Sequence, residues 1–201
     1  MTELAALVAR AGRLATPGAR RILGIAGPPG AGKSRLAARL AAELPAAIVV
    51  GMDGFHLADA ELRRRGLRDR KGAPETFDRA GFAALLARLR TETGVIYAPA
   101  FDRDLEDSIA AAVAVEPSVR LVLTEGNYLL HWPEVRRQLD EVWYLDPEPA
   151  QRRAALVARH VRHGKAADEA AAWTDGPDQR NAELVAADRE LADLLVDWGE
   201  W

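Results

Sequence analysis

The segment from Arg21 to Ser34 reads RILGIAGPPGAGKS, and it decides how the rest of the chain is interpreted. Its first part, Arg21–Ala26, is a short apolar run typical of a buried strand. The next eight residues fit the pattern Gly-x-x-x-x-Gly-Lys-Ser. Leucines at helical spacing follow and stop before Pro45, so we expect a helix directly after the pattern. A glycine-rich pattern between a strand and a helix is typical of a loop that binds phosphate groups.

The residue types of this loop suit a nucleoside triphosphate. Glycines let backbone N–H groups approach phosphate oxygens where a Cβ atom would block them, and the following helix adds the positive end of its dipole. We expect Lys33 to reach the β- and γ-phosphates as a catalytic residue, and Ser34 to give its hydroxyl to Mg²⁺. The residues predicted to bind ATP are Gly27, Pro28, Pro29, Gly30, Ala31, Gly32, Lys33, Ser34 and Arg35.

Two large classes of triphosphate-binding protein are excluded by missing motifs. A GTPase carries a guanine-reading Asn-Lys-x-Asp motif, but the two asparagines of this chain, Asn127 and Asn181, precede Tyr128 and Ala182. The Ser-Gly-Gly-Gln signature of transporter-type ATPases is absent as well. A small-molecule kinase or an ATP-dependent switch remains.

The composition fits one soluble globular domain. The chain has 201 residues, of which 49% are hydrophobic and 28% are charged. A formal net charge of −3 argues against nucleic acid as a partner. The absence of cysteine excludes disulfides, thiolate zinc sites and cysteine nucleophiles. Because no apolar run approaches the ~20 residues of a membrane span, we expect a cytoplasmic protein without a membrane partner, either a monomer or a homodimer.

Further apolar runs predict the rest of the architecture. Besides residues 21–26, strands are expected at residues 48–50, 95–97, 120–124 and 142–145, with an additional alternating piece at Val113 and Val115. Helices are expected at residues 2–14, at 78–91 and throughout the chain after Pro149, with breaks at Gly164 and at residues 174–177. This pattern indicates an α/β fold: a doubly wound parallel sheet of about five strands, with helices on both faces and a helical lid. We expect residues 1–201 to form a single domain, with an acceptor-side segment at about 53–80 and the lid at about 151–177.

Two acidic residues follow predicted strands. Asp53 comes after residues 48–50, and Glu125 follows residues 120–124. If the second strand lies next to the first, Asp53 faces the γ-phosphate and is placed to accept the proton of an attacking hydroxyl. Glu125 has the position of a carboxylate that binds Mg²⁺ directly or through a water. The alternatives are a turn or helix-capping aspartate and a surface glutamate.

Basic residues gather in two segments. Residues 61–71 hold Arg63, Arg64, Arg65, Arg68, Arg70 and Lys71. They face either an acceptor or phosphate group, or solvent along a helix. The predicted helix after Pro149 holds Arg152, Arg153, Arg159 and Arg162. As a lid, this helix would bring one or two arginines over the phosphates, and Arg159 is our candidate catalytic arginine. His160 and His163 have no evident third ligand, so ordinary surface histidines are expected there.

Together these features resemble the phosphoribulokinase, uridine kinase and pantothenate kinase superfamily of P-loop kinases. The segments MDGFHL (52–57), RGL (65–67) and RKGAPETFD (70–78) look like the bacterial pantothenate kinase signature, and PAFDR (99–103) and EGNYLL (125–130) extend the match. The resemblance covers most of residues 22–182. It is strongest to the short proteins labelled nucleoside/nucleotide kinase or fructose transport system kinase.

This resemblance implies a doubly wound kinase fold that uses ATP and Mg²⁺. Asp53 would match the base of the family, Glu125 its magnesium-side carboxylate, and the helix from Arg152 to Arg162 its lid. The residues expected to bind the phosphoryl acceptor are Asp53, Phe55, His56, Arg70, Lys71, Tyr97, Asp102, Arg103 and Tyr128.

Two departures from the family leave the acceptor open. The chain is shorter than a bacterial pantothenate kinase, and it carries Asp-Gly-Phe-His at residues 53–56 where uridine kinases have Asp-Ser-Phe-Tyr. The expected function is an ATP-dependent kinase that transfers the γ-phosphoryl group to a hydroxyl of a small metabolite. Fructose or another sugar, a nucleoside and a pantothenate-like alcohol all fit. The alternative is a nucleotide-gated regulatory or assembly protein without an acceptor.

Overall fold

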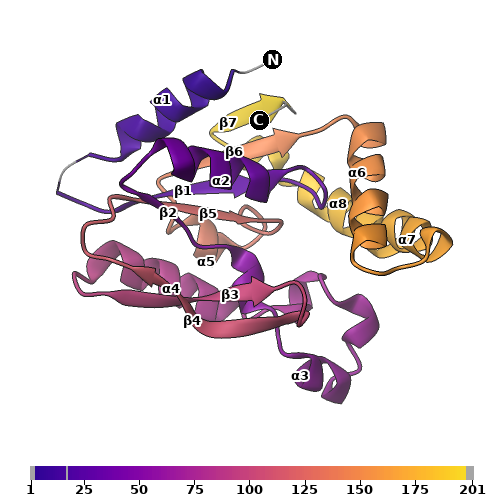
Figure 1. Ribbon diagram of the computed structural model, residues 1–201. Coiled ribbons are helices and arrows are strands. Elements are labelled where there is room, and N and C mark those ends of the chain that lie inside the picture. The colour runs from indigo at the N-terminus through magenta and orange to yellow at the C-terminus, as the bar shows by residue number, and fades with distance from the viewer. Residues whose placement is uncertain (1–2, 17, 198–201) are drawn as a thin grey trace.

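The apolar run at residues 21–26 forms β1, the middle strand of a five-stranded parallel sheet (Figure 1). The computed structural model describes residues 3–16 and 18–197. Across the sheet the strands are β2 (Ala47–Val49), β5 (Leu121–Gly126), β1 (Arg21–Ala26), β6 (Glu141–Asp146) and β7 (Leu194–Asp197). All neighbouring strands in this order are parallel. The predicted α/β fold with a parallel sheet of about five strands is confirmed.

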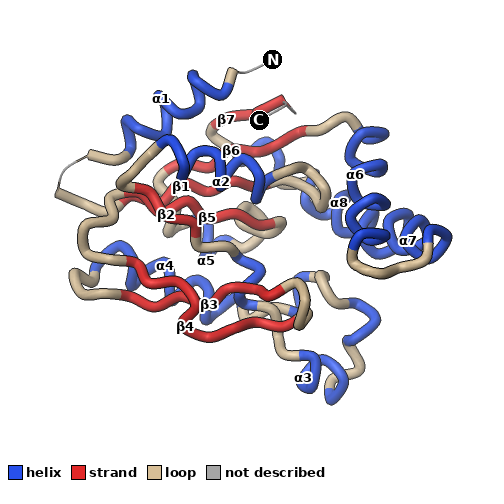
Figure 2. The backbone as a smooth tube through the Cα atoms, in the orientation of Figure 1, coloured by secondary structure: helices blue, strands red, loops and turns tan. Residues whose placement is uncertain are grey.

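Side chains of the central strand alternate between two cores. Leu23 and Ile25 pack on one face of the sheet against α1 (Leu4–Leu14) and α2 (Lys33–Glu43). Ile22 and Ala26 belong to the core on the other face, which α4 (Arg79–Thr91) and α5 (Pro133–Arg136) cover. Figure 2 shows these helices on opposite sides of the strands. A strand with apolar residues on both faces is buried in this way only between two helical layers.

The expected strand at residues 95–97 is not part of this sheet. It begins β3 (Ile96–Asp102), which pairs antiparallel with β4 (Asp107–Val115) in a separate two-stranded hairpin. The hairpin lies over α4 (Figure 1). A short turn is enough to join antiparallel strands, whereas joining the parallel sheet requires a longer crossover. The alternation at Val113 and Val115 belongs to β4.

The fifth strand of the main sheet lies in a region that the pattern predicts to be helical. Strand β7 has only four residues, too few to show a strand periodicity. The carboxylate of Asp193 accepts a hydrogen bond from the backbone N–H of Val142 at 2.7 Å and docks the start of β7 beside β6. Strand β5 also separates β1 from β2, so the second strand of the chain is not the neighbour of the first.

Three helices follow β6 at one end of the sheet: α6 (Pro149–Arg162), α7 (Ala167–Trp173) and α8 (Gln179–Ala186) (Figure 1). Gly164 ends α6 with a φ of +93°, a left-handed conformation that favours glycine. The break expected at residues 174–177 is instead a π-helical turn, Thr174–Asp178, which joins α7 to α8 without interruption. The wider π turn accommodates Pro177, which has no N–H to donate.

The segment between β2 and α4 consists of short elements. It holds the 3-10 turns Met52–Phe55, Arg68–Arg70 and Pro74–Thr76 and the helix α3 (Asp59–Arg64). Asp78 ends the segment and caps α4, because its carboxylate accepts a hydrogen bond from the N–H of Gly81 at 2.9 Å. Within the described ranges, no helix is both long and apolar enough to span a bilayer.

Asp140 connects β1, β6 and α4 by hydrogen bonds. Its carboxylate accepts from the backbone N–H of Ile22 and from the guanidinium groups of Arg21 and Arg90, each at 2.8 Å. Burial would raise the pKa of Asp140, but these donors hold it below its ordinary value.

We expect Asp140→Ala to lower the free energy of unfolding at neutral pH by about 2 kcal/mol, because three donors lose their acceptor. A carboxylate whose pKa is depressed by folding contributes stability above its unfolded-state pKa and loses that contribution as the pH falls. In urea unfolding, the difference in the free energy of unfolding between wild type and variant should have its full size above about pH 5 and shrink below about pH 4. A difference that stays constant down to about pH 3 would contradict this role.

Candidate active site

A cavity of about 1200 Å³ opens at the carboxyl ends of β1 and β5. Residues 27–34, called the phosphate loop below, form its floor, and α6 forms one wall. Further lining residues come from the turn between β3 and β4 and from the short elements that follow β2. In open α/β sheets, ligands bind at this edge.

The phosphate loop has a backbone that only glycine permits at several positions. Gly30 and Gly32 have φ angles of +82° and +86°. A Cβ atom on Gly27 would lie 2.7 Å from the carbonyl oxygen of Leu145, and one on Gly30 would lie 2.6 Å from Cγ of Leu156. The loop therefore packs directly against β6 at Gly27 and against α6 at Gly30, where a side chain would clash.

Lys33 begins α2 and is buried, with 8% of the residue exposed. Its Nζ donates to the carbonyl oxygen of Pro28 at 3.0 Å and to Oδ1 of Asn127 at 2.8 Å. Burial lowers the pKa of Lys33 to about 8, although the carboxylates of Glu125 and Asp53 favour its charged form. An anion that entered the loop would stabilise this ammonium further.

Two carboxylates share the cavity with Lys33. Asp53 lies in the 3-10 turn Met52–Phe55, and Glu125 lies in β5. Burial raises the pKa of Glu125, and the negative charge of Asp53 raises it further. The hydroxyl of Ser34 donates to Oε1 of Glu125 at 3.1 Å.

These oxygens fit a magnesium ion. Mg²⁺ prefers hard oxygen ligands and is commonly held by one or two carboxylates together with phosphate oxygens. The Ser34 hydroxyl and the Glu125 carboxylate are such ligands, and they already lie side by side below the loop. A divalent cation there would also offset the repulsion between Glu125 and Asp53.

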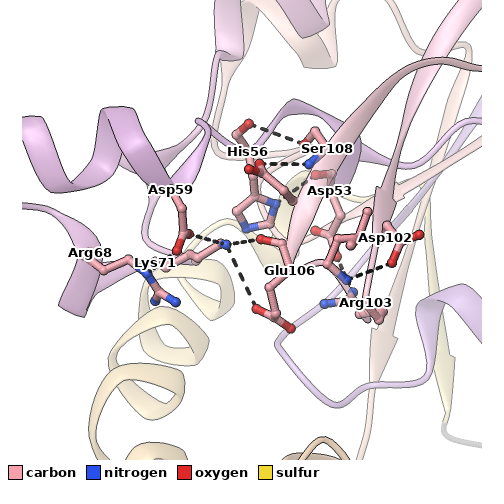
Figure 3. Close-up of polar contacts among 12 residues, drawn as sticks. Asp53, His56, Asp59, Arg68, Lys71, Asp102, Arg103, Glu106 and Ser108 are labelled. Atoms are coloured by element: carbon pink, nitrogen blue, oxygen red, sulfur yellow. Dashed lines mark hydrogen bonds and ion pairs between the residues drawn. The ribbon is translucent and has the colours of Figure 1, made fainter.

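Asp53 lies among positive groups. One guanidinium nitrogen of Arg103 donates to its Oδ2 at 2.5 Å, and Nδ1 of His56 lies 2.8 Å from its carbonyl oxygen (Figure 3). Burial would raise the pKa of Asp53, but His56, Arg103 and Lys33 outweigh it and hold the pKa below its ordinary value. Asp53 is therefore a carboxylate that is already engaged by a cation in this structure.

Arg152 and Arg159 lie on one face of α6, as their spacing predicts. Arg152 is buried and donates to the carbonyl oxygen of Pro29 at 3.4 Å and to the side chain of Gln179. It therefore connects α6 to the phosphate loop and to α8. Arg159 lines the cavity, where burial lowers its pKa and the positive charge of Arg103 lowers it further. Arg159 of α6 and Arg103 of the β3–β4 turn thus both line the cavity.

His160 differs from expectation. Its side chain is 14% exposed, and its Nε2 lies 2.7 Å from Oδ2 of Asp178 in the π-helical turn. The prediction of an ordinary surface histidine is therefore wrong for His160, because this pair holds α6 against the turn.

Two other basic residues of this segment are exposed. His163 is exposed and lines the cavity. Arg153 is exposed and pairs with Asp175 at 2.6 Å.

The cavity brings together most of the residues predicted for ATP, metal and acceptor. It is lined by Pro29, Gly30, Gly32, Lys33, Ser34, Arg35, Asp53, His56, Lys71, Arg103, Glu125 and Arg159. Gly27, Pro28 and Ala31 belong to the phosphate loop but do not line the cavity, and Ala31 packs into the core on the α2 face.

Five residues predicted to bind the acceptor lie outside the cavity lining: Phe55, Arg70, Tyr97, Asp102 and Tyr128. The ring of Phe55 packs on Phe82, with centroids 5.0 Å apart. Tyr128 is buried in the core, and its hydroxyl donates to the carbonyl oxygen of Gly72 at 2.6 Å. Phe55 therefore anchors the acceptor-side segment to α4, and Tyr128 contacts the same segment at Gly72.

The other three are turned away by local geometry. Arg70 pairs with Glu75 at 2.6 Å. Tyr97 is 60% exposed, because the alternation of β3 sends its neighbours Ile96 and Ala98 inward. The carboxylate of Asp102 accepts hydrogen bonds from the backbone N–H groups of Asp104 and Leu105 and closes the turn between β3 and β4.

Some cavity residues were not among the predicted site residues. Asn127, which holds Lys33, follows directly on the end of β5, so its position after Glu125 is the signal that sequence reasoning can use. Trp173 and Lys165 also line the cavity, with Nζ of Lys165 4.7 Å from the centre of the ring. Lys165 lies in the connection between α6 and α7, whereas Trp173 is the last residue of α7, and no sequence pattern pairs them.

Comparison with known proteins places this geometry in a family. No protein-family model matches the chain. The Schizosaccharomyces pombe protein C227.14, whose designation as a uridine kinase is provisional, is 34% identical over 194 residues, which are 88% of this chain and 83% of that protein. The crystal structure of a Silicibacter sp. TM1040 protein, provisionally designated a fructose transport system kinase, is 40% identical with a TM-score of 0.90 over 98% of this chain and 100% of that one.

The chain belongs to the P-loop kinase family that includes uridine kinase. The pantothenate kinase of Mycolicibacterium vanbaalenii is also related, at 28% identity over 165 residues, which cover 71% of this chain and 53% of that enzyme. The resemblance noted in the sequence is confirmed. This P-loop kinase is an ATP-dependent phosphotransferase that acts on an alcohol group.

Lys33 should titrate near pH 8 in the free kinase, because burial disfavours its charge. The sequence has three lysines, Lys33, Lys71 and Lys165, so an NMR titration of lysine-labelled protein can follow each one, and Lys33→Gln assigns the signal. Mg·ATP should raise the midpoint, since phosphate groups favour the ammonium. A midpoint near the ordinary value of about 10.4 in the free protein would contradict the desolvated position of Lys33.

Proposed function

We propose that the protein transfers the γ-phosphoryl group of Mg·ATP to a hydroxyl group of a small metabolite, such as a sugar, a nucleoside or a pantothenate-like alcohol. The observation that supports this most is the meeting of Lys33, Asp53 and Glu125 in one cavity at the phosphate loop. A cation for the phosphates, a base for the hydroxyl and a ligand for the metal are the parts that phosphoryl transfer to an alcohol needs.

Each of these residues has a separate task. Backbone N–H groups of the phosphate loop bind the phosphates, and Lys33 follows the γ-phosphoryl group into the transition state. The acceptor oxygen forms a bond to the γ-phosphorus while the bond from that phosphorus to the β–γ bridging oxygen breaks. Asp53 takes the proton of the acceptor hydroxyl, and ADP leaves.

Ser34 and Glu125 would hold the magnesium ion. When bound, Mg²⁺ neutralises charge on the phosphate oxygens. Glu125 suits this task better than that of a base, because the Ser34 hydroxyl already donates to it and places it under the loop. Asp53 lies on the opposite side, beside the acceptor-side residues His56 and Arg103.

The helices after β6 are proposed to act as a lid. Within a single domain, the lid comprises about residues 151–177, and the acceptor-side segment comprises about residues 53–80. Arg159 would reach the γ-phosphate from α6 when the lid closes. Closure excludes water from the transferring group, and this prevents hydrolysis of ATP.

Asp53→Asn keeps the shape of the side chain and removes the base. In an ADP-release assay with Mg·ATP and a panel of sugars, nucleosides and pantothenate-like alcohols, we expect acceptor-stimulated turnover to fall by about 10²–10⁴. The affinity for ATP should change little. Asp188→Asn is the matched control, since Asp188 pairs with His131 outside the cavity. Tight ATP binding without stimulation by any acceptor would instead support the nucleotide-gated regulator.

Glu125→Gln separates the metal ligand from the base. We expect the variant to need more Mg²⁺ for half-maximal activity, and added Mg²⁺ should recover part of the rate, because only one of several oxygen ligands is weakened. The measurement is ADP release against Mg²⁺ concentration at saturating ATP. If Mg²⁺ rescued Asp53→Asn but not Glu125→Gln, the two roles would have to be exchanged.

A further inference from the structure

The residue that follows β5 lies beside the phosphate loop. Strands β1 and β5 pair in parallel register, with Ala26 opposite Gly126. The next residues of the two strands are Gly27, which begins the phosphate loop, and Asn127. A Cβ atom on Gly126 would lie 2.5 Å from Cβ of Met52, so close packing fixes the backbone just before Asn127. Asn127 is half-buried and lines the cavity.

Lys33 determines which way the side-chain amide of Asn127 faces. Nζ of Lys33 donates to Oδ1 of Asn127 at 2.8 Å. An ammonium group has only donors, so the amide atom that faces it is the oxygen. The NH₂ group is bonded to the same carbon and therefore points away from Lys33. The contact with Lys33 thus sets the direction of two further donor hydrogens.

These two donor hydrogens have no acceptor within residues 3–16 and 18–197. The carboxylates of Asp53 and Glu125 share the cavity, but their hydrogen bonds come from Arg103 and Ser34. A donor that is partly removed from water gains stability from an acceptor. The NH₂ group of Asn127 is therefore available to a ligand that enters the cavity.

The γ-phosphoryl group of ATP is the ligand group beside this donor. Lys33 uses two of its three donor hydrogens on Pro28 and Asn127, which leaves the third for a phosphate oxygen. A γ-phosphoryl group bound by Lys33 carries further oxygens, over which its negative charge is spread. The amide that contacts Lys33 is placed to donate to one of these oxygens.

We propose that Asn127 is a catalytic residue whose NH₂ group donates a hydrogen bond to an oxygen of the γ-phosphoryl group, while its Oδ1 keeps Lys33 in place. This inference rests on the proposed function, because it concerns the group that is transferred. The amide forms and breaks no covalent bond. It stabilises the negative charge on the phosphoryl oxygens in the transition state.

A neutral amide suits both tasks. Its oxygen accepts from Lys33 and its nitrogen donates to the phosphate, whereas a carboxylate at residue 127 would bind Lys33 and repel the phosphate. The cavity already holds two carboxylates, and the negative charge of Asp53 raises the pKa of Glu125. An amide adds a donor for the phosphate without adding a third negative charge.

Two nucleotides that differ in the γ-phosphoryl group test the contact. The affinities of Mg²⁺ with a non-hydrolysable ATP analogue and of Mg·ADP are measured by calorimetry. We expect Asn127→Ala to weaken binding of the analogue by about tenfold or more, and binding of ADP by less than about twofold. A residue that only supported the loop would weaken both nucleotides equally, and that result would overturn the proposal. Gln138→Ala is the matched control and should change neither affinity, because it removes an amide outside the cavity lining.

A double variant separates direct contact from action through Lys33. In the Lys33→Ala background, Asn127→Ala should weaken the analogue by about a further fivefold or more, because the amide contacts the phosphate itself. If Asn127→Ala had no effect in this background, Asn127 would act only by holding Lys33, and the proposal would be wrong.

Asn127→Asp provides a variant of the same shape. It keeps the oxygen that accepts from Lys33 and removes the NH₂ donor. We expect it to weaken the analogue at least as much as Asn127→Ala does, and to lower kcat in ADP release by about 10–100-fold. An aspartate variant that bound the analogue as tightly as the wild type would contradict the contact, whether or not Asn127→Ala folds.

The outcomes separate this inference from the proposed function. If the wild-type protein bound both nucleotides but no acceptor stimulated ADP release, the proposed function would fail for the acceptors used. The two nucleotide affinities would then still decide the role of Asn127. If acceptor-stimulated turnover were the same in wild type and Asn127→Ala, the inference would be overturned and the phosphotransfer would stand.

Discussion

The buried charge of Lys33 is the constraint on which the rest of the site depends. An ammonium group with little exposure needs acceptors, and it finds them in the carbonyl oxygen of Pro28 and the side chain of Asn127. These two groups belong to the loop after β1 and to the end of β5, so the two strands must lie side by side, as they do. The carboxylates of Asp53 and Glu125 favour the charged form of Lys33. Without Lys33, two partly buried carboxylates would face each other with less positive charge nearby.

Local patterns predict β1, the phosphate loop and α2 correctly, because everything that determines them lies within one segment. The order of the strands in the sheet, by contrast, depends on contacts between segments that are far apart in the sequence. Strand β5 enters between β1 and β2, although the first residues that pair between β2 and β5, Ala47 and Leu121, are 74 positions apart in the sequence (121 − 47). Nothing within Ile96–Asp102 indicates an antiparallel partner, and β7 is too short to show a period. These features depend on which surfaces pack together in the complete chain.

The site, too, combines features that one segment determines with features that depend on distant parts of the chain. Asp53 lines the cavity although the reason given for it, a second strand beside the first, is wrong. The 3-10 turn that carries Asp53 packs directly on the end of β5, where a Cβ atom on Gly126 would lie 2.5 Å from Cβ of Met52. This contact brings Asp53 past β5 to the phosphate loop. The pairing of His160 with Asp178 arises only when the chain turns back after α6, so the sequence contains no sign of it.

Close packing also fixes which part of the acceptor wall can move. A Cβ atom on Gly54 would lie 2.6 Å from the carbonyl oxygen of Pro99, so the backbone beside Asp53 rests against β3 without a gap. Lys71 binds the carbonyl oxygen of Glu106 and holds the turn between β3 and β4 from the other side. The backbone frame is therefore rigid, and the half-exposed side chain of Arg103 is the part with freedom to turn. A substitution of Arg103 should therefore change the contacts of the Asp53 carboxylate while the phosphate loop stays in place.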